Sequence, residues 1–237
     1  MLAHLTLTHA SYAAGKPILT DITLTLTEPR IGIIGRNGSG KTTLLRLMAG
    51  LIAATSGTVR LGTLDPARDR KALLTQLGIL FQNPDHQILF PTVEEELAFG
   101  LRQQGHPDPA GAVAALLKTE QRSHWAKAAT HTLSQGQRHY LCLLSVLLMN
   151  PGILLLDEPF AGLDLPTQTR LARRIAALPQ QVITISHDPL AMAAADRVIW
   201  LDQGRIRADG PAAQVLAAFT AEMARLGSDD ADTDLAR

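Results

Sequence analysis

The stretch of nine residues from Gly35 to Thr43, GRNGSGKTT, constrains the fold of this chain more than any other feature. It fits the pattern G-x-x-x-x-G-K-[ST], follows a short apolar run at residues 31–34, and precedes a helical pattern of leucines. Its glycines let successive backbone N–H groups point inward, and a helix N-terminus adds positive potential. The pattern predicts a strand, a phosphate-binding loop and a helix, made of Gly35, Arg36, Asn37, Gly38, Ser39, Gly40, Lys41, Thr42 and Thr43.

Two side chains of this loop carry specific chemistry. Lys41 is expected to place its charge against the β- and γ-phosphates of a nucleotide, and the Thr42 hydroxyl is expected to bind Mg²⁺. The alternative, an ordinary glycine-rich turn with a solvated lysine, is disfavoured by the complete motif with both flanks in place.

A pair of acids follows a second buried strand. Residues 153–156 form an unbroken apolar run, typical of a parallel strand covered on both faces, and Asp157 and Glu158 come directly after it. Ligands of open α/β sheets bind at that end of the strands. We expect Asp157 to hold Mg²⁺ opposite Thr42, and Glu158 to act as general base on the attacking water. Alone, such a pair is as well explained by a solvated loop.

The pattern of elements along the chain predicts one α/β domain with an insertion. Apolar and polar side chains alternate at residues 5–7 and 22–27, which favours antiparallel strands near the N-terminus. Strand and helix patterns then alternate over 1–82 and 151–226, which predicts the α/β core, while 83–150 is helical throughout. The end, 227–237, is polar and acidic, and we expect a frayed tail there.

Composition narrows the class of function. The chain of 237 residues has 22 basic and 22 acidic residues, whereas a nucleic-acid-binding protein usually has a basic excess. The N-terminus lacks the pattern of a signal peptide, and no apolar run is long enough for a membrane span. We therefore expect a cytoplasmic protein without a nucleic-acid partner.

Residues 133–138, LSQGQR, open an apolar helix shortly before the Asp157 strand. With the two motifs above, this segment makes the chain resemble the ATPase subunits of ATP-binding-cassette (ABC) transporters over nearly its whole length. The resemblance implies a P-loop NTPase cassette, with a RecA-like core sheet, an N-terminal antiparallel β subdomain and an inserted α-helical subdomain. It also implies ATP hydrolysis by two subunits in a homodimer or heterodimer, with ATP and Mg²⁺ bound between them.

The resemblance assigns roles to further residues by their positions in the family pattern. Tyr12 would stack on adenine, Gln82 would sense the γ-phosphate and contact Mg²⁺, and His187 would contact the γ-phosphate. The segment Ser134, Gln135, Gly136 and Gln137 would bind ATP held by the other subunit, and Asp164 would lie at the dimer interface. Each of these residues alone has an ordinary structural explanation. Position 135 departs from the family, which usually has glycine there.

The run Asn83-Pro84-Asp85-His86-Gln87-Ile88 is similar to the ATPases of energy-coupling-factor importers, which take up vitamins and transition-metal ions. That likeness implies a transmembrane coupling protein and a substrate-binding membrane protein as partners, at the cytoplasmic face of a prokaryotic membrane. The short chain favours biotin as cargo, with cobalt or nickel next. The alternatives are a soluble cassette ATPase acting on a non-membrane partner, and a regulatory module that binds nucleotide without hydrolysing it.

Overall fold

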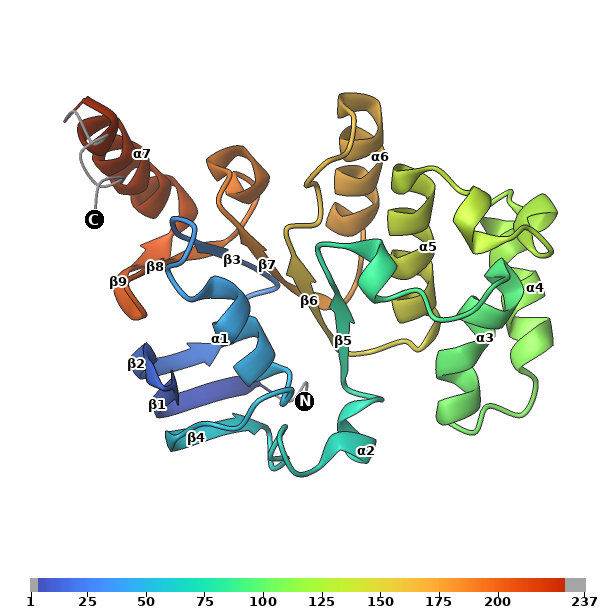
Figure 1. Ribbon diagram of the computed structural model, residues 1–237, viewed down its shortest axis with the longest axis horizontal. Helices are drawn as coiled ribbons and strands as arrows, with labels where there is room; N and C mark the ends of the chain where they lie inside the picture. The colour runs from blue at the N-terminus through green and yellow to red at the C-terminus, as the bar shows by residue number, and fades with distance from the viewer. Residues whose placement is uncertain (1–3, 229–237) are drawn as a thin grey trace.

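The computed structural model describes residues 4–228, which form two β-sheets and two groups of helices (Figure 1). The strands are β1 (Leu5–Ala14), β2 (Lys16–Leu26), β3 (Arg30–Ile34), β4 (Ser56–Leu61), β5 (Leu77–Leu80), β6 (Ile153–Asp157), β7 (Gln181–Ser186), β8 (Arg197–Asp202) and β9 (Arg205–Pro211). The α-helices are α1 (Lys41–Met48), α2 (Arg70–Leu73), α3 (Val93–Gln103), α4 (Pro109–Thr119), α5 (Gln135–Leu148), α6 (Leu165–Ala176) and α7 (Ala212–Ser228). Short 3-10 helices are η1 (Pro84–His86), η2 (Ser123–Trp125), η3 (Thr130–Thr132) and η4 (Pro189–Met192).

The larger sheet has the order β5-β6-β7-β3-β8-β9. Its first five strands are parallel, and β9 returns antiparallel to β8. All five residues of β6 are buried, because helices cover both faces of the sheet. The phosphate loop follows the central strand β3, so the topology sets it at the carboxyl edge of the sheet, where β6 and β7 also end.

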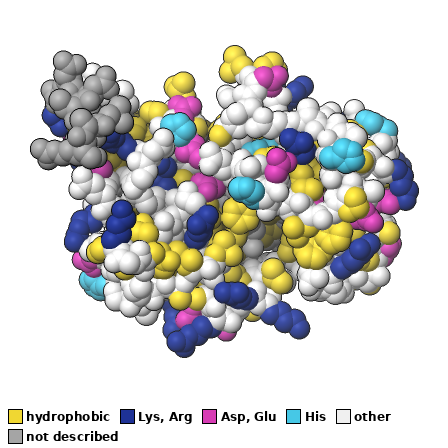
Figure 2. All heavy atoms as spheres, viewed as in Figure 1, with side chains coloured by type: hydrophobic (Ala, Val, Ile, Leu, Met, Phe, Trp, Pro, Cys, Tyr) yellow, Lys and Arg dark blue, Asp and Glu magenta, His cyan; other side chains and the backbone are white. Residues whose placement is uncertain are grey.

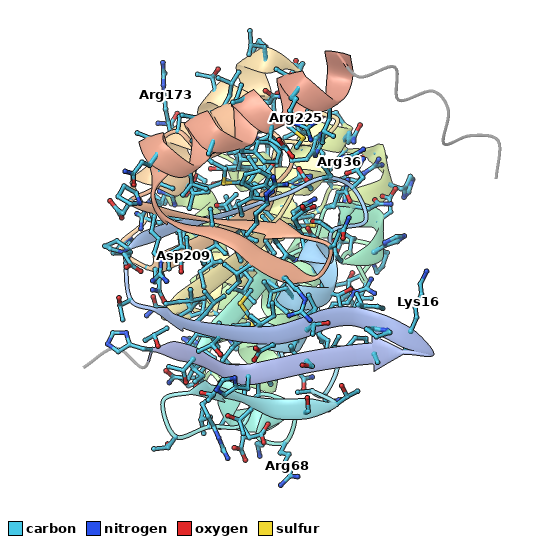
Figure 3. All side chains as sticks on the ribbon, turned by 90° about the vertical axis from the view of Figure 1, so that its left-hand side faces the viewer. Lys16, Arg36, Arg68, Arg173, Asp209 and Arg225 are labelled. Carbon is cyan, nitrogen blue, oxygen red and sulfur yellow. The ribbon has the colours of Figure 1, made fainter. Side chains whose placement is uncertain are left out.

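The smaller sheet is antiparallel, with the order β2-β1-β4. Helix α1 lies between the two sheets, and one apolar cluster contains residues of both sheets and of α1. Figure 3 shows this sheet below the larger one, with α7 across the top, and Lys16 and Arg36 projecting on the same side. Strand β1 extends well beyond the expected residues 5–7, because register shifts after Leu7 interrupt the alternation that marks a strand.

Helices α3, α4 and α5 pack around their own apolar cluster, which includes Trp125. Local sequence sets the helix starts: the Thr92 hydroxyl accepts from Glu95 N before α3, and Asp108 accepts from Gly111 N before α4, where Pro109 follows. Among the described residues, no helix is both long and apolar enough to cross a membrane.

Two elements beyond residue 201 were not expected from the sequence. Strand β9 pairs with β8, and α7 packs on both through contacts such as Trp200 with Phe219, whose ring centroids are 5.4 Å apart. Helix α7 continues through Ser228 and so includes the first two residues of the expected tail, 227 and 228. The rest of that tail, residues 229–237, lies outside the described part of the chain. The α/β fold with an antiparallel subdomain and a helical insertion is confirmed.

Candidate nucleotide-binding and hydrolysis site

The phosphate loop connects β3 to α1 as the sequence predicts. Gly38 and Gly40 have φ of 80° and 102°, which side-chain-bearing residues rarely adopt. Gly35 has no space for a side chain, since a Cβ there would lie 2.2 Å from Leu201 O. Lys41 folds back over the loop, and its Nζ donates to Gly35 O at 2.7 Å and to Arg36 O at 3.0 Å. The ammonium group therefore lies within the curl of the loop.

Lys41 is buried, and desolvation lowers the pKa of its ammonium, whereas the nearby carboxylates of Glu158 and Asp157 raise it. The cation inside the loop is suited to an anionic ligand, and the two acids that face it across the carboxyl edge of the sheet are suited to a metal ion. The acids and the loop come from β6 and β3, which are separated in the sheet by β7.

Asp157 ends β6 and is 4% exposed. Burial and the neighbouring Glu158 raise the pKa of its carboxyl, while a hydrogen bond with Thr42 and the charge of Lys41 lower it. Its Oδ1 is buried and has no hydrogen-bond partner among the described residues. A buried carboxylate with one oxygen unsatisfied, beside a threonine hydroxyl, offers the hard oxygen ligands that Mg²⁺ prefers.

Glu158 follows at once, and a φ of 47° turns its side chain toward the end of β7. Its Oε1 accepts from His187 N at 2.9 Å and lies 2.8 Å from His187 Nδ1. The Ser186 hydroxyl donates to Oε2 at 2.7 Å. Glu158 and His187 were both singled out from the sequence, and the structure joins them directly. Ser186 was not, although its place immediately before His187 at a strand end marks it as a neighbour of the site.

The segment 134–137 forms the start of α5. Ser134 caps the helix by accepting from Gln137 N at 3.3 Å, while the Gln137 side chain accepts from Ser134 N at 2.8 Å. The Gln135 side chain lies over Gly162, where a Cβ would be 2.7 Å from its Nε2. Gly162 has a φ of 70° and no side chain, so the loop before α6 gives the room that a glutamine at position 135 needs.

Several of the predicted site residues line two separate hollows. Gly35, Arg36, Asn37 and His187 line one hollow of about 480 Å³ beside α7. Ser134, Gly136, Gln137 and Asp164 line another, of about 720 Å³, between α5 and α6. Within one chain, therefore, these two pockets have no lining residue in common.

The remaining predicted residues have less direct placements. Tyr12 is half-buried in β1 and pairs with Leu19, whose side chain lies against Gly40. Gln82 is exposed and shares a hollow with Gln135, and no described contact joins it to Thr42 or Asp157. Asp164 caps α6 by accepting from Thr167 N at 3.0 Å. Thr43 is the third residue of α1. The roles assigned to these side chains stay predictions.

Comparison with known proteins agrees with this geometry. Residues 19–161 match the ABC transporter family. The chain is 49% identical over 214 residues to the biotin transport ATP-binding protein BioM of Rhodobacter capsulatus, covering 90% of this chain and 92% of that one. It is 41% identical over 203 residues to the BioM protein of Rhizobium etli, covering 85% and 90%.

Among solved structures, cbiO1 from Clostridium perfringens, described as part of the ABC transporter complex cbiONQ, aligns with a TM-score of 0.78 and 26% identity over 99% of both chains. The family match includes the phosphate loop, the 134–137 segment, Asp157 at the end of β6 and Glu158 directly after it. The chain is thus an ATPase of the ABC transporter family.

Proposed function

We propose that two copies of this chain, or one copy and a related ATPase, hydrolyse ATP to energise an importer of the energy-coupling-factor type, with biotin as the cargo. One observation carries the cargo assignment: 49% identity, over 90% of the chain, to a protein described as a biotin transport ATP-binding protein. Cobalt or nickel import, which the resemblance to energy-coupling-factor importers also implies, is the second candidate.

Each ATP would lie between two chains. The loop around Lys41 would hold the phosphates, and the start of α5 around Ser134 in the other chain would close on the γ-phosphate. The support is geometric, because these two groups line different hollows of one chain. The exposed Ser134, at a helix N-terminus, is suited to a phosphate from outside the chain.

Magnesium would be held by Thr42 and Asp157 together with phosphate oxygens, where it would neutralise charge on the phosphates. Glu158 would accept the proton of the attacking water. Its carboxylate is fixed by Ser186 and by the backbone N–H of His187, which orients the group before ATP arrives. The His187 side chain is more than half exposed and would contact the γ-phosphate.

The contact with a transmembrane coupling protein would lie between β5 and α3. Figure 2 shows hydrophobic side chains gathered over this part of the molecule. Leu89 is 68% exposed, and its half-buried neighbours Ile88 and Phe90 flank it. Exposed apolar side chains in a row favour a protein partner. The protein would then work at the cytoplasmic face of the membrane, beside a separate membrane protein that binds the cargo.

The test is transport by the purified complex. The chain would be isolated from native membranes with its bound partners, reconstituted in proteoliposomes, and supplied with ATP and Mg²⁺ on the side that carries the chain. We expect uptake of labelled biotin that Lys41→Ala abolishes, because the loop loses its cation. Uptake of cobalt or nickel in place of biotin would refute the assignment of biotin as the cargo. ATP-dependent activity without any membrane partner would refute the importer assignment.

A further inference from the structure

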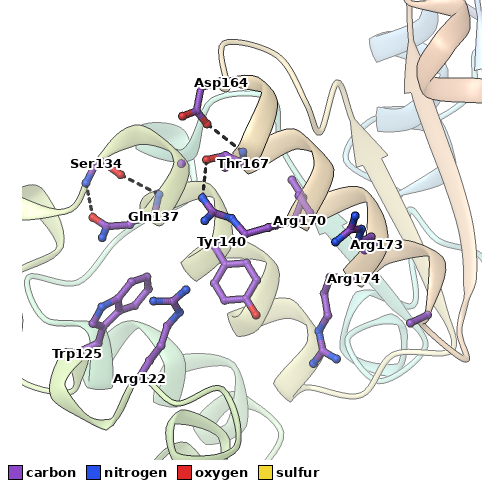
Figure 4. Close-up of a pocket in the computed structure, with 13 residues that line it drawn as sticks. Arg122, Trp125, Ser134, Gln137, Tyr140, Asp164, Thr167, Arg170, Arg173 and Arg174 are labelled. Carbon is purple, nitrogen blue, oxygen red and sulfur yellow. Dashed lines mark hydrogen bonds between the residues drawn. The ribbon is translucent and has the colours of Figure 1, made fainter.

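The hollow of about 720 Å³ between η2, α5 and α6 contains four arginines (Figure 4). Arg122 comes from the segment before η2, and the other three from α6. Figure 4 shows Arg122 and Arg170 reaching from opposite sides toward the space around Tyr140. Four arginines on one concave surface favour an anionic ligand.

Contacts with uncharged groups hold two of the guanidinium groups, those of Arg122 and Arg170. Arg122 lies over two rings, with its Cζ 4.4 Å from the centroid of Trp125 and 5.4 Å from that of Tyr140. An aromatic contact fixes the guanidinium plane but supplies no negative charge. The Arg170 Nη2 donates to Thr167 Oγ1 at 3.1 Å, again a neutral partner.

Acidic groups at this hollow are few. Among residues 4–228, only Arg174 of the four arginines has a recorded ion pair, with Glu120 at 2.7 Å, and Tyr140 donates its hydroxyl to the same carboxylate. The Nε of Arg174 is buried without a hydrogen-bond partner in the described part of the chain. Asp164 lies at the opposite end from Arg174, where its carboxylate interacts electrostatically with Arg170. Four positive charges thus face two negative ones, and the hollow is electropositive.

The proposed ATP site does not account for the arginines. Ser134, Gly136 and Asp164 lie at one end of the hollow, and Ala177 lines the other. The 12 residues of α6 separate Asp164 from Ala177, which corresponds to about 20 Å at 1.5 Å rise per residue. A γ-phosphate held by Ser134 would leave the end near Arg173 and Arg174 open to a second ligand.

We propose that this hollow binds a small phosphorylated molecule, with its phosphates on Arg122, Arg170 and Arg174. Guanidinium groups match phosphate oxygens in pairs, and groups already fixed by stacking or hydrogen bonds lose little freedom on binding. The volume is that of a site for a complete small molecule and exceeds the space that one phosphate fills. The half-buried ring of Tyr140 supplies an apolar face beside the charges.

The ligand would join two parts of the molecule. Arg122 and Tyr140 belong to the helical insertion, and Arg170 and Arg174 belong to α6 of the core, so a polyanion between them would add contacts across that boundary. The capped start of α5 lies at the same hollow. The bound molecule would therefore restrain the helical insertion relative to the core, which provides a means for a metabolite to adjust ATPase activity.

Trp125 offers a direct measurement, because Arg122 stacks on its ring. The chain has two tryptophans, and Trp200→Phe leaves Trp125 as the only one. Tripolyphosphate would be titrated without ATP in a variant that also carries Lys41→Ala, which weakens the phosphate loop as a competing site. We expect saturable change in Trp125 fluorescence, with half-saturation weakened about tenfold or more by Arg122→Ala.

The matched control is Arg102→Ala, at an exposed arginine of the same helical insertion that lines none of the hollows described above. It removes an equal charge and should leave binding within twofold of the parent. Equal weakening by Arg102→Ala and Arg122→Ala would reduce the effect to general electrostatics and overturn the proposal. So would the absence of saturation. If Trp200→Phe impairs folding, calorimetric titration with both tryptophans in place measures the same dissociation constants.

Anionic lipid headgroups also carry phosphate groups. A binding experiment with lipid vesicles distinguishes a lipid headgroup from a free phosphorylated molecule. Co-sedimentation with phosphatidylglycerol vesicles should be insensitive to Arg122→Ala. If that substitution abolishes vesicle binding while tripolyphosphate gives no saturable change, the site serves a lipid surface and the free-metabolite proposal is wrong. All of these measurements are independent of ATP hydrolysis and of transport.

Discussion

Replacing Asp157 by Asn should make the chain more stable while it removes most of its activity. Asp157 is 4% exposed, its Oδ1 has no partner among the described residues, and burial together with the adjacent Glu158 raises the pKa of its carboxyl. An unsatisfied buried polar atom costs about 1–3 kcal/mol, and a charged one costs more. Asn keeps the shape and removes the charge. We expect a gain of about 1 kcal/mol in the free energy of unfolding without nucleotide.

A gain of that size corresponds to a rise of about 2–4 °C in the melting temperature of a domain of this length. It would be measured by circular dichroism at pH 7 without nucleotide or Mg²⁺. ATPase activity should fall by about 10- to 100-fold, as is usual when a group that orients a metal site is lost. The control is Asp69→Asn, which should shift stability by less than about 0.5 kcal/mol, because Asp69 is exposed and an Asn side-chain oxygen can still accept from Asp65 N.

The dependence on pH gives a second check. The pKa of Asp157 in the folded chain lies above its ordinary value of 3.8, so folding favours the protonated form. The unmodified chain therefore loses stability as pH rises from 3.8 through the raised pKa, and Asp157→Asn does not. The advantage of the variant should be full above that pKa and should shrink below it. A lower melting temperature at pH 7 would show that the carboxylate stabilises the fold, and would refute the reasoning.

Three further predictions concern ATP turnover and docking. Glu158→Gln keeps the shape but removes the base, so ATP and Mg²⁺ should give a dimer that persists in size-exclusion chromatography; a variant that stays monomeric or hydrolyses ATP normally contradicts the assigned role. Mixing inactive Lys41→Ala with inactive Ser134→Arg should restore part of the ATPase activity, since one site of each mixed dimer has two sound halves. No ATP binding by demonstrated mixed dimers would argue against shared sites. Leu89→Ser should weaken co-purification of the membrane partner by about tenfold while basal ATPase activity is retained, and equal loss of both would place Leu89 in the catalytic site.

The parts of the site that a sequence can predict are those whose chemistry is local. The phosphate loop requires glycines at particular positive φ values next to a lysine, so Gly38, Gly40 and Lys41 are recognisable without a structure. The capped start of α5 is equally local, because Ser134 and Gln137 satisfy each other within one turn. The buried strand before Asp157 is evident from its apolar run. Each of these features depends on residues close together in the chain.

The features that escaped prediction depend on partners far away in sequence. Strand β1 keeps its pairing through register shifts that hide the alternation. Ser186 acquires its contact with Glu158 across 28 positions of the chain. The arginine-lined hollow is assembled from η2, α5 and α6, and Arg122 by itself is an unremarkable basic residue in the sequence. Periodicity and motif spacing contain no information about contacts between residues that are far apart in the sequence.

The two loops proposed to meet the other chain form a single unit in this one. A Cβ on Gly136, in the first turn of α5, would lie 2.9 Å from the Thr167 methyl in the first turn of α6, and Gln135 rests on Gly162. Asp164 in turn caps α6 through Thr167 N. The start of α5 therefore contacts both the first turn of α6 and the loop before it. These two contacts couple any shift of the 134–137 segment to a shift of the loop that contains Asp164. If a phosphate bound to the other chain contacts Ser134, any shift of Ser134 toward it would carry Asp164 along, and Gln135 would move as part of the same unit.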